Sequence, residues 1–84
     1  MNRAARLRAS GCAHRLALIL ALELRLEGVS PAVLVDLFGF SQRRAVALLN
    51  GHPEAIPAME LDRLATLAHL GLYELLRAAE NPPP

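Results

Sequence analysis

Residues 30–51 read SPAVLVDLFGFSQRRAVALLNG. The segment opens with a serine followed by a proline, which are the residues favoured at the N-cap and at the first position of a helix. We therefore expect a helix over 31–38 that ends at the glycine after it. Ser41 repeats the cap and predicts a helix over 42–50, which the next glycine ends. Two helices of about eight residues, joined by a short turn that contains glycine, are the sequence pattern of a helix-turn-helix.

In the residues before this segment, the periodicity and the helix propensity point to different structures. Every even-numbered position from Leu16 to Leu26 is leucine, and this alternation is typical of a strand. The residues between the leucines are mostly Ala, Glu and Arg, which form helices well, so we predict a helix over 13–27. Leucines cover most of its circumference. It is therefore either a central helix wrapped by the others or a helix that also faces a second subunit.

Two further helices are expected after the helix-turn-helix, over 57–70 and 72–80, with leucines at helical spacing in both. Leucine and alanine supply 33 of the 84 residues, whereas the chain has two Phe, one Tyr and no Trp. The prediction is an all-α, five-helix bundle with an aliphatic core and a central helix-turn-helix. It divides the chain into a basic flexible arm over 1–12, the bundle over 13–80 and a proline tail over 81–84.

Catalysis is not expected. A helical domain of this size has little interior to spare for a substrate cavity. We find no nucleophile–base pair, carboxylate pair or phosphate-binding loop. Cys12 and the three histidines do not fall at metal-ligand spacings, so no metal and no cofactor are expected.

The charge of the chain is uneven along its length. The net charge is +1, yet residues 1–15 carry four Arg and no acid, and residues 41–53 carry two Arg and no acid. Local positive charge attracts phosphate, although a basic terminus can also be no more than a solubilising tail. The same basic start followed by a short apolar run resembles a signal peptide. The run is too short to span a bilayer and charged residues follow it, so we expect a cytoplasmic protein without a membrane contact.

The first turn of the helix over 42–50 is unusually cationic and indicates an anionic ligand. Gln42, Arg43 and Arg44 follow the cap, and no acid is present there. A helix N-terminus already bears a partial positive charge, so each cation costs about 0.3–1 kcal/mol. An external anion would remove that penalty, and phosphate would also use the free amides of the helix end. The alternative is that Arg is simply common in this chain.

One face of this helix offers a set of side chains suited to the DNA major groove. Ala45 and Leu48 lie on the opposite face and are expected to pack inside the bundle. Arg can pair with guanine, Gln can pair with adenine, and small apolar groups can meet a thymine methyl. The predicted arc, about 140° wide, comprises Gln42, Arg43, Val46, Ala47 and Asn50. Its two small apolar residues, with Leu49 at its edge, also fit a surface that binds protein.

The segment 30–51 resembles the Cro/repressor-type helix-turn-helix family, whose fold is that of a lambda-repressor-like DNA-binding domain. The capping serine, Val35, the turn glycine, the Ser-Gln opening, Leu48 and the closing Asn-Gly fall in register with that family. The resemblance extends over about residues 16–77 and is greatest to short regulators and antitoxin-like members. The run 24–30 is also similar to the DNA-binding end of sigma factors. The Asn-Gly stop and the two later helices favour the repressor type.

The resemblance implies a transcriptional regulator, most simply a repressor, that binds double-stranded DNA as a homodimer. Base contacts would come from Gln42, Arg43, Val46 and Ala47. Phosphate contacts would come from the ends of the helix and the loop after it. Those residues are Ser41, Arg44, Asn50 and His52, joined by Arg3, Arg6 and Arg8 of the basic arm. The competing hypothesis is a protein-interaction module, such as an antitoxin or adaptor with a degenerate helix-turn-helix and a cognate toxin as partner.

Overall fold

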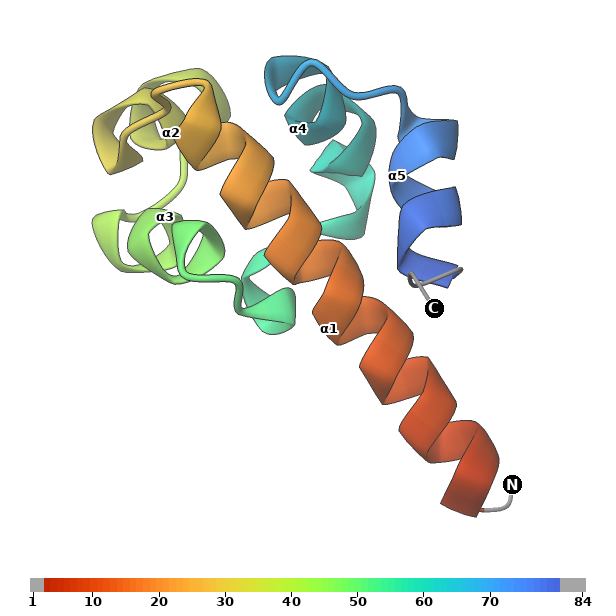
Figure 1. Cartoon of the computed structure of the whole chain (residues 1–84). Coiled ribbons are helices and arrows are strands. Elements are labelled where there is room, and N and C mark those ends of the chain that lie inside the picture. The colour runs from red at the N-terminus through yellow and green to blue at the C-terminus, as the bar shows by residue number, and fades with distance from the viewer. Residues whose placement is uncertain (1–2, 81–84) are drawn as a thin grey trace.

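Five α-helices and two single 3-10 turns make up residues 3–80 (Figure 1). The structure, a computed structural model, describes the backbone of residues 3–80 and the side chains of residues 11–80. The elements in order are α1 Arg3–Leu26, α2 Pro31–Phe38, α3 Gln42–Leu49, η1 Pro53–Ala55, η2 Ala58–Glu60, α4 Leu61–Leu67 and α5 Leu72–Glu80. No strand occurs in the described residues, and the predicted all-α class is confirmed.

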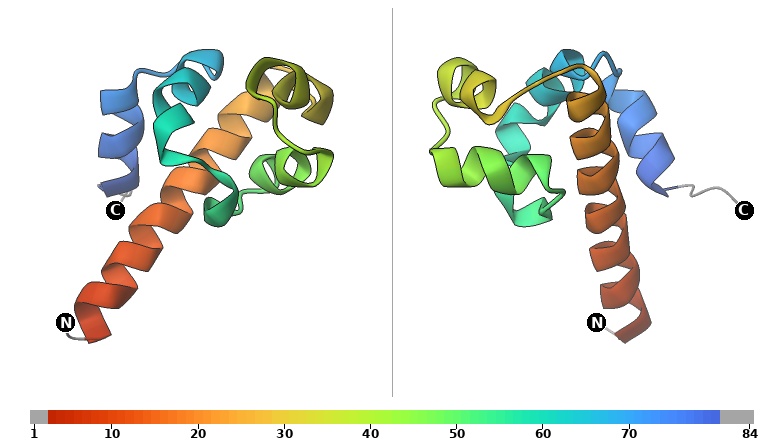
Figure 2. Two further views of the ribbon diagram at one scale, coloured as in Figure 1. Left: turned by 180° about the vertical axis from the view of Figure 1, so that it is seen from behind. Right: turned by 60° about the vertical axis from the view of Figure 1, so that its left-hand side comes forward.

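The long helix α1 divides the molecule. Helices α2 and α3 lie on one side of it and α4 and α5 on the other, and its N-terminal part extends beyond all of them (Figures 1 and 2). This extension gives the molecule its elongated shape, with extents of 40 × 22 × 20 Å. None of the helices within residues 3–80 combines the length and the apolar composition needed to cross a lipid bilayer.

Helix α1 begins earlier than predicted. The sequence suggested a flexible arm over 1–12 with a break at Gly11, whereas the helix starts at Arg3 and runs through that glycine. The reason is that Gly11 does not adopt the left-handed conformation that ends a helix, unlike Gly28 after the last turn of α1. A single glycine inside a helix costs only about 1 kcal/mol. Because the residues before it are mainly Arg, Ala and Leu, the helix continues across it.

The leucine alternation in α1 lies on a helix, as predicted. A two-residue repeat on a helix distributes side chains around the whole axis, so the leucines do not share one environment. Leu20 and Leu24 are fully buried, whereas Leu18, Leu22 and Leu26 are exposed. The helix is therefore central to the core on one side and leaves an apolar row uncovered on the other.

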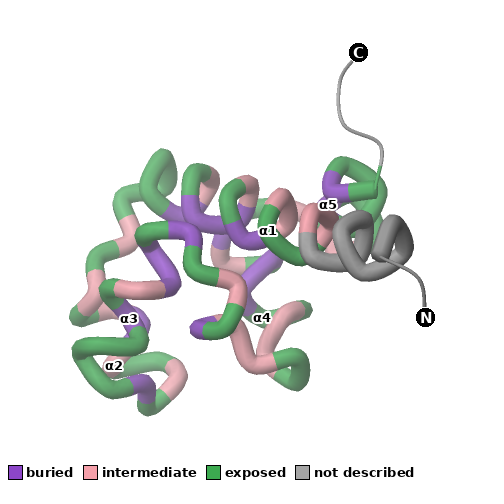
Figure 3. Tube along the Cα trace, turned by 90° about the horizontal axis from the view of Figure 1, so that it is seen from below, coloured by how far each residue is buried: buried purple, intermediate pink, exposed green. Residues whose placement is uncertain are grey.

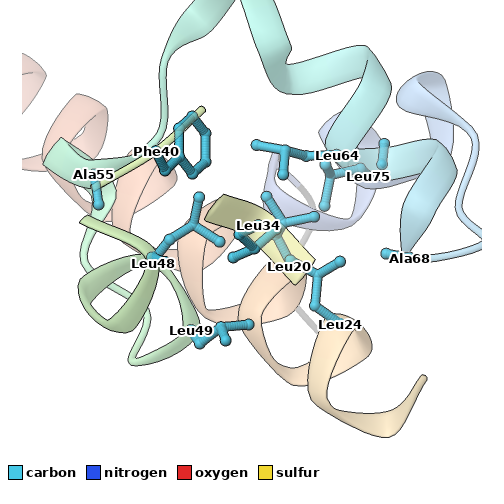
Figure 4. Close-up of a cluster of buried hydrophobic side chains, with 12 residues drawn as sticks. Leu20, Leu24, Leu34, Phe40, Leu48, Leu49, Ala55, Leu64, Ala68 and Leu75 are labelled. Atoms are coloured by element: carbon cyan, nitrogen blue, oxygen red, sulfur yellow. The ribbon is translucent and has the colours of Figure 1, made fainter. Parts of the chain in front are cut away.

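The core is aliphatic apart from Phe40 and lies where α1 meets the other helices (Figures 3 and 4). Every helix contributes at least one side chain to it. The largest side chains with no appreciable exposure are Leu20, Leu24, Leu34, Leu48, Leu64 and Leu75. No buried side-chain nitrogen or oxygen in the described residues lacks a hydrogen-bond partner. The core therefore stabilises the fold by apolar burial and carries no uncompensated polar group.

The predicted bounds of α2 and α3 are confirmed to within one residue. Pro31 occupies the start of α2, and Gly39 ends that helix with φ +69°. Ser41 Oγ accepts a hydrogen bond from the Arg44 amide at 3.1 Å, which is the expected cap of α3. Ser30 has cap dihedrals, but its side chain makes no capping hydrogen bond.

Aromatic rings hold the turn between α2 and α3. The rings of Phe38 and Phe40 stack with centroids 5.3 Å apart. The Arg63 guanidinium of α4 lies 4.7 Å from the Phe38 centroid and donates to the Leu37 carbonyl. A cation over an aromatic face is attracted by the ring quadrupole. These contacts link the turn to α4 and fix the point at which α3 begins.

Helix α4 is shorter than the sequence predicted. Of the expected range 57–70, residues 58–60 form a 3-10 turn and only Leu61–Leu67 is α-helical. The chain leaves α4 through His69, which has φ +59°, and not through Gly71 as the glycine pattern suggested. A residue with a Cβ is strained at such a φ, so the glycine pattern expects this conformation at a glycine. The pattern therefore placed the turn at Gly71 and not at His69.

Replacing His69 by glycine is expected to stabilise the protein. Glycine removes the left-handed strain of about 1–2 kcal/mol, and its own entropic cost leaves a net gain of about 0.5 kcal/mol. The exposed pair of His69 and Glu27, with Nε2 and Oε2 3.4 Å apart, contributes little. Thermal unfolding of His69→Gly checks the gain, and Glu27→Gln controls for the lost pair. A His69→Gly variant that melts below the natural protein contradicts this account.

Two glycines with positive φ permit a matched comparison. A Cβ on Gly39 would meet nothing within 4 Å, whereas a Cβ on Gly51 would lie 2.7 Å from Leu18 Cδ2. Alanine at either position carries the left-handed penalty of about 1–2 kcal/mol. Gly51→Ala is expected to cost more than Gly39→Ala, because Leu18 must also move. Urea titrations of both variants measure the difference in the free energy of unfolding. Equal losses of stability would show that the Leu18 side chain moves aside without an energetic cost.

Candidate nucleic-acid interface

Helix α3 is held by one face and exposes the other. Ala45 and Leu48 are buried, as predicted, and Leu49 is buried with them. These three side chains face the core that α3 shares with α1 and α2. The burial of Leu49 corrects its predicted place at the edge of the exposed arc, and it removes this residue from the apolar surface that the protein-interaction hypothesis invoked.

The exposed face of α3 carries most of the predicted arc. Gln42, Arg43, Val46 and Asn50 are exposed, and Ala47 is half-buried. Val46 keeps 40% of its surface accessible, so the middle of the helix presents a small apolar group between polar ends. The structure therefore brings together on one surface the side chains that the helical wheel grouped.

The two arginines at the start of α3 are not neutralised by neighbouring acids. Both side chains are exposed, and neither takes part in an ion pair within the described residues. The Arg44 guanidinium lies 5.8 Å from the centroid of the Phe40 ring, which orients it without changing its charge. No acid lies in the first turn of the helix. This helix end therefore combines free backbone amides with two cations.

One acidic side chain lies close to this cationic end. Glu54 lines a hollow of about 300 Å³ that Arg43 and Arg44 also line. Its carboxylate oxygen Oε1 lies 3.4 Å from Nδ1 of His52. It forms no ion pair with either arginine. His52, which is itself a predicted phosphate contact, is exposed. Glu54 therefore lowers the local positive potential without occupying the arginines.

The far end of α3 is fixed by a residue that sequence reasoning did not single out. Arg25 of α1 donates from Nε to the Leu49 carbonyl at 2.8 Å and from Nη2 to Asn50 Oδ1 at 2.7 Å. A cation at a helix C-terminus is favourable, because the last carbonyls are unpaired there. Asn50 is thus both a predicted phosphate contact and a partner of α1. The contact joins residues 25 positions apart, and no local pattern reveals it.

The predicted contacts of the basic N-terminus lie partly outside the described residues. The backbone of Arg3, Arg6 and Arg8 belongs to α1, but their side chains are not among those described.

Within the described part of the chain, no three His, Cys, Asp or Glu side chains gather as a metal site would require.

Comparison with models of protein families, with curated proteins and with solved structures finds no significant match to this chain.

Proposed function

We propose that this protein is a sequence-specific DNA-binding regulator of transcription, in the manner of a repressor, without catalysis of its own. In this proposal α2 and α3 form a helix-turn-helix of the Cro/repressor type, and α3 lies in the major groove. Gln42, Arg43, Val46 and Ala47 meet the base edges. The phosphate contacts are Ser41, Arg44, Asn50 and His52, with Arg3, Arg6 and Arg8 as further contacts.

The observation that carries the proposal is the exposed, unpaired cationic turn at the start of α3. Arg43 and Arg44 weaken the helix where they stand, because the helix dipole opposes them. Neither an acid of the same helix nor an ion pair offsets this cost in the described residues. A polyanion such as the phosphate backbone of DNA offsets it.

The proposal includes a homodimer on a two-fold symmetric site. One domain of this size covers a modest area of DNA, and two copies related by a dyad place their α3 helices one helical turn of DNA apart. The copies would contact each other through α1, α5 or both.

Selection from a pool of random duplex DNA tests the proposal. The expected result is enrichment of a palindromic sequence, with an affinity that falls steeply as the salt concentration rises. Failure to enrich any sequence, together with a weak and shallow salt dependence, contradicts the proposal.

The apolar row on α1 favours a second candidate, a protein-interaction module of the antitoxin or adaptor kind. Leu18, Leu22 and Leu26 are exposed at a four-residue spacing, and such a row is typical of a face that packs on another chain. This candidate predicts a tight complex with a protein partner and only weak binding to DNA. Measuring both affinities under one buffer condition separates the two functions.

A further inference from the structure

The bridge between α1 and α3 determines which atoms Asn50 presents to solvent. Asn50 stands at the C-terminal end of α3, and its backbone amide bonds to the carbonyls of Val46 and Ala47. Its side-chain oxygen accepts from Arg25 Nη2. An arginine can only donate hydrogen bonds, so the atom of the amide that faces it must be the oxygen. The two N–H groups of the Asn50 amide therefore point away from Arg25.

The environment of this bridge contains donors and no acid. Arg25 uses Nε and one N–H of Nη2 in the bridge, which leaves three further N–H groups. Hollows of about 290 Å³ and 280 Å³ lie on either side of it. Arg25, Leu49 and Asn50 line both hollows, and the other lining residues are apolar. Because no carboxylate lines either hollow, the free donors have no acidic partner there.

We propose that Arg25 is a positioning residue that turns the Asn50 amide outward as a donor-only group, so that Asn50 binds a phosphate oxygen and does not read bases. This inference rests on the proposed function and specifies one end of the same interface. An asparagine that reads adenine needs its oxygen and its nitrogen together. Arg25 binds one lone pair of the oxygen and turns that oxygen toward α1, so the amide presents its N–H groups outward and Asn50 contributes affinity without base preference.

This arrangement places donors at both ends of α3. Arg44 and Asn50 are six residues apart in sequence, which corresponds to about 9 Å along a helix axis. The major groove is about 12 Å wide, so a helix lying in it has a phosphate strand within reach of each end. Arg44 then binds phosphate at one end, and Asn50 binds it at the other.

Asn50→Asp tests the donor role without removing the bridge. The new carboxylate has nearly the shape of the amide and accepts from Arg25, so the melting temperature is expected to stay the same or rise. Its outward oxygen repels phosphate, and the affinity for a 20-base-pair random duplex is expected to fall about tenfold or more. Ala78→Asp adds the same charge on α5 and controls for the overall charge. Equal affinities of the two variants overturn the proposal.

A double-mutant cycle tests the positioning role of Arg25. If Arg25 acts through Asn50, Asn50→Ala weakens duplex binding in the natural protein but has little further effect in an Arg25→Met background. Independent contacts would instead give additive losses, which overturns the positioning role. Should Arg25→Met fail to fold, the Asn50→Asp comparison still decides the donor role. If the natural protein itself shows no salt-sensitive duplex binding, the proposed function fails, and that outcome is distinct from a normal duplex affinity in Asn50→Asp.

Discussion

Leu48→Ala is expected to lower the free energy of unfolding by about 2–5 kcal/mol. Leu48 is 1% exposed and belongs to the core cluster in which α3 meets α1 and α2 (Figure 4). Alanine loses the transfer free energy of the removed carbons and leaves a cavity that its neighbours fill only in part. Because a domain of this length has a stability of about 4–13 kcal/mol, the variant will be marginally folded. Urea denaturation followed by circular dichroism measures the loss.

Leu26→Ala is the matched control for this prediction. The same carbons are removed from α1, but Leu26 is 71% exposed. Substitutions at such positions usually change stability by less than about 0.5 kcal/mol. If both leucine variants lose the same stability, the described core is not the source of the cooperative fold.

The second large effect is expected on DNA binding. Arg43→Ala removes the predicted base contact and should cost about 1–3 kcal/mol of binding free energy with relaxed sequence preference. Arg44→Ala removes a predicted phosphate contact and should weaken binding to all sequences alike, reducing the salt slope by about one. Binding isotherms at several salt concentrations, on a selected duplex and on a scrambled duplex, separate the two effects.

Arg77→Ala provides the control for the loss of a positive charge. Arg77 is exposed on α5, on the other side of α1 from α3 (Figure 1). It should change the affinity for DNA only slightly. Neither arginine variant of α3 should be less stable than the natural protein, because both side chains oppose the helix dipole. Unchanged affinity in Arg43→Ala and Arg44→Ala would contradict the assignment of α3 as the DNA-binding surface.

Local signals predicted the helices around the turn well. Proline at a first helical position, serine caps and glycine stops act within a few residues, so the bounds of α2 and α3 could be read directly. The same signals failed at Gly11 and Gly71, because a glycine ends a helix only where the backbone takes a positive φ. That choice depends on tertiary packing, which also placed the turn after α4 at His69.

The candidate site was predictable in part for the same reason. Helical periodicity alone identified Ala45 and Leu48 as the buried side of α3 and Gln42 and Arg43 as exposed. The position of Leu49 was predicted wrongly, because the helical wheel does not show where α1 packs against α3. The bridge from Arg25 to Asn50 depends on how two helices pack, and residue spacing along the chain does not predict it.

The separation of α3 into an anchored row and an outward row has an evolutionary consequence. Ala45, Leu48 and Leu49 hold the helix in the core, whereas Gln42, Arg43 and Val46 face outward. Exchanges at outward positions have little thermodynamic cost to the scaffold. In the proposed DNA-binding role, a daughter protein that arises by gene duplication can therefore change its target through a few outward exchanges while inheriting an intact framework.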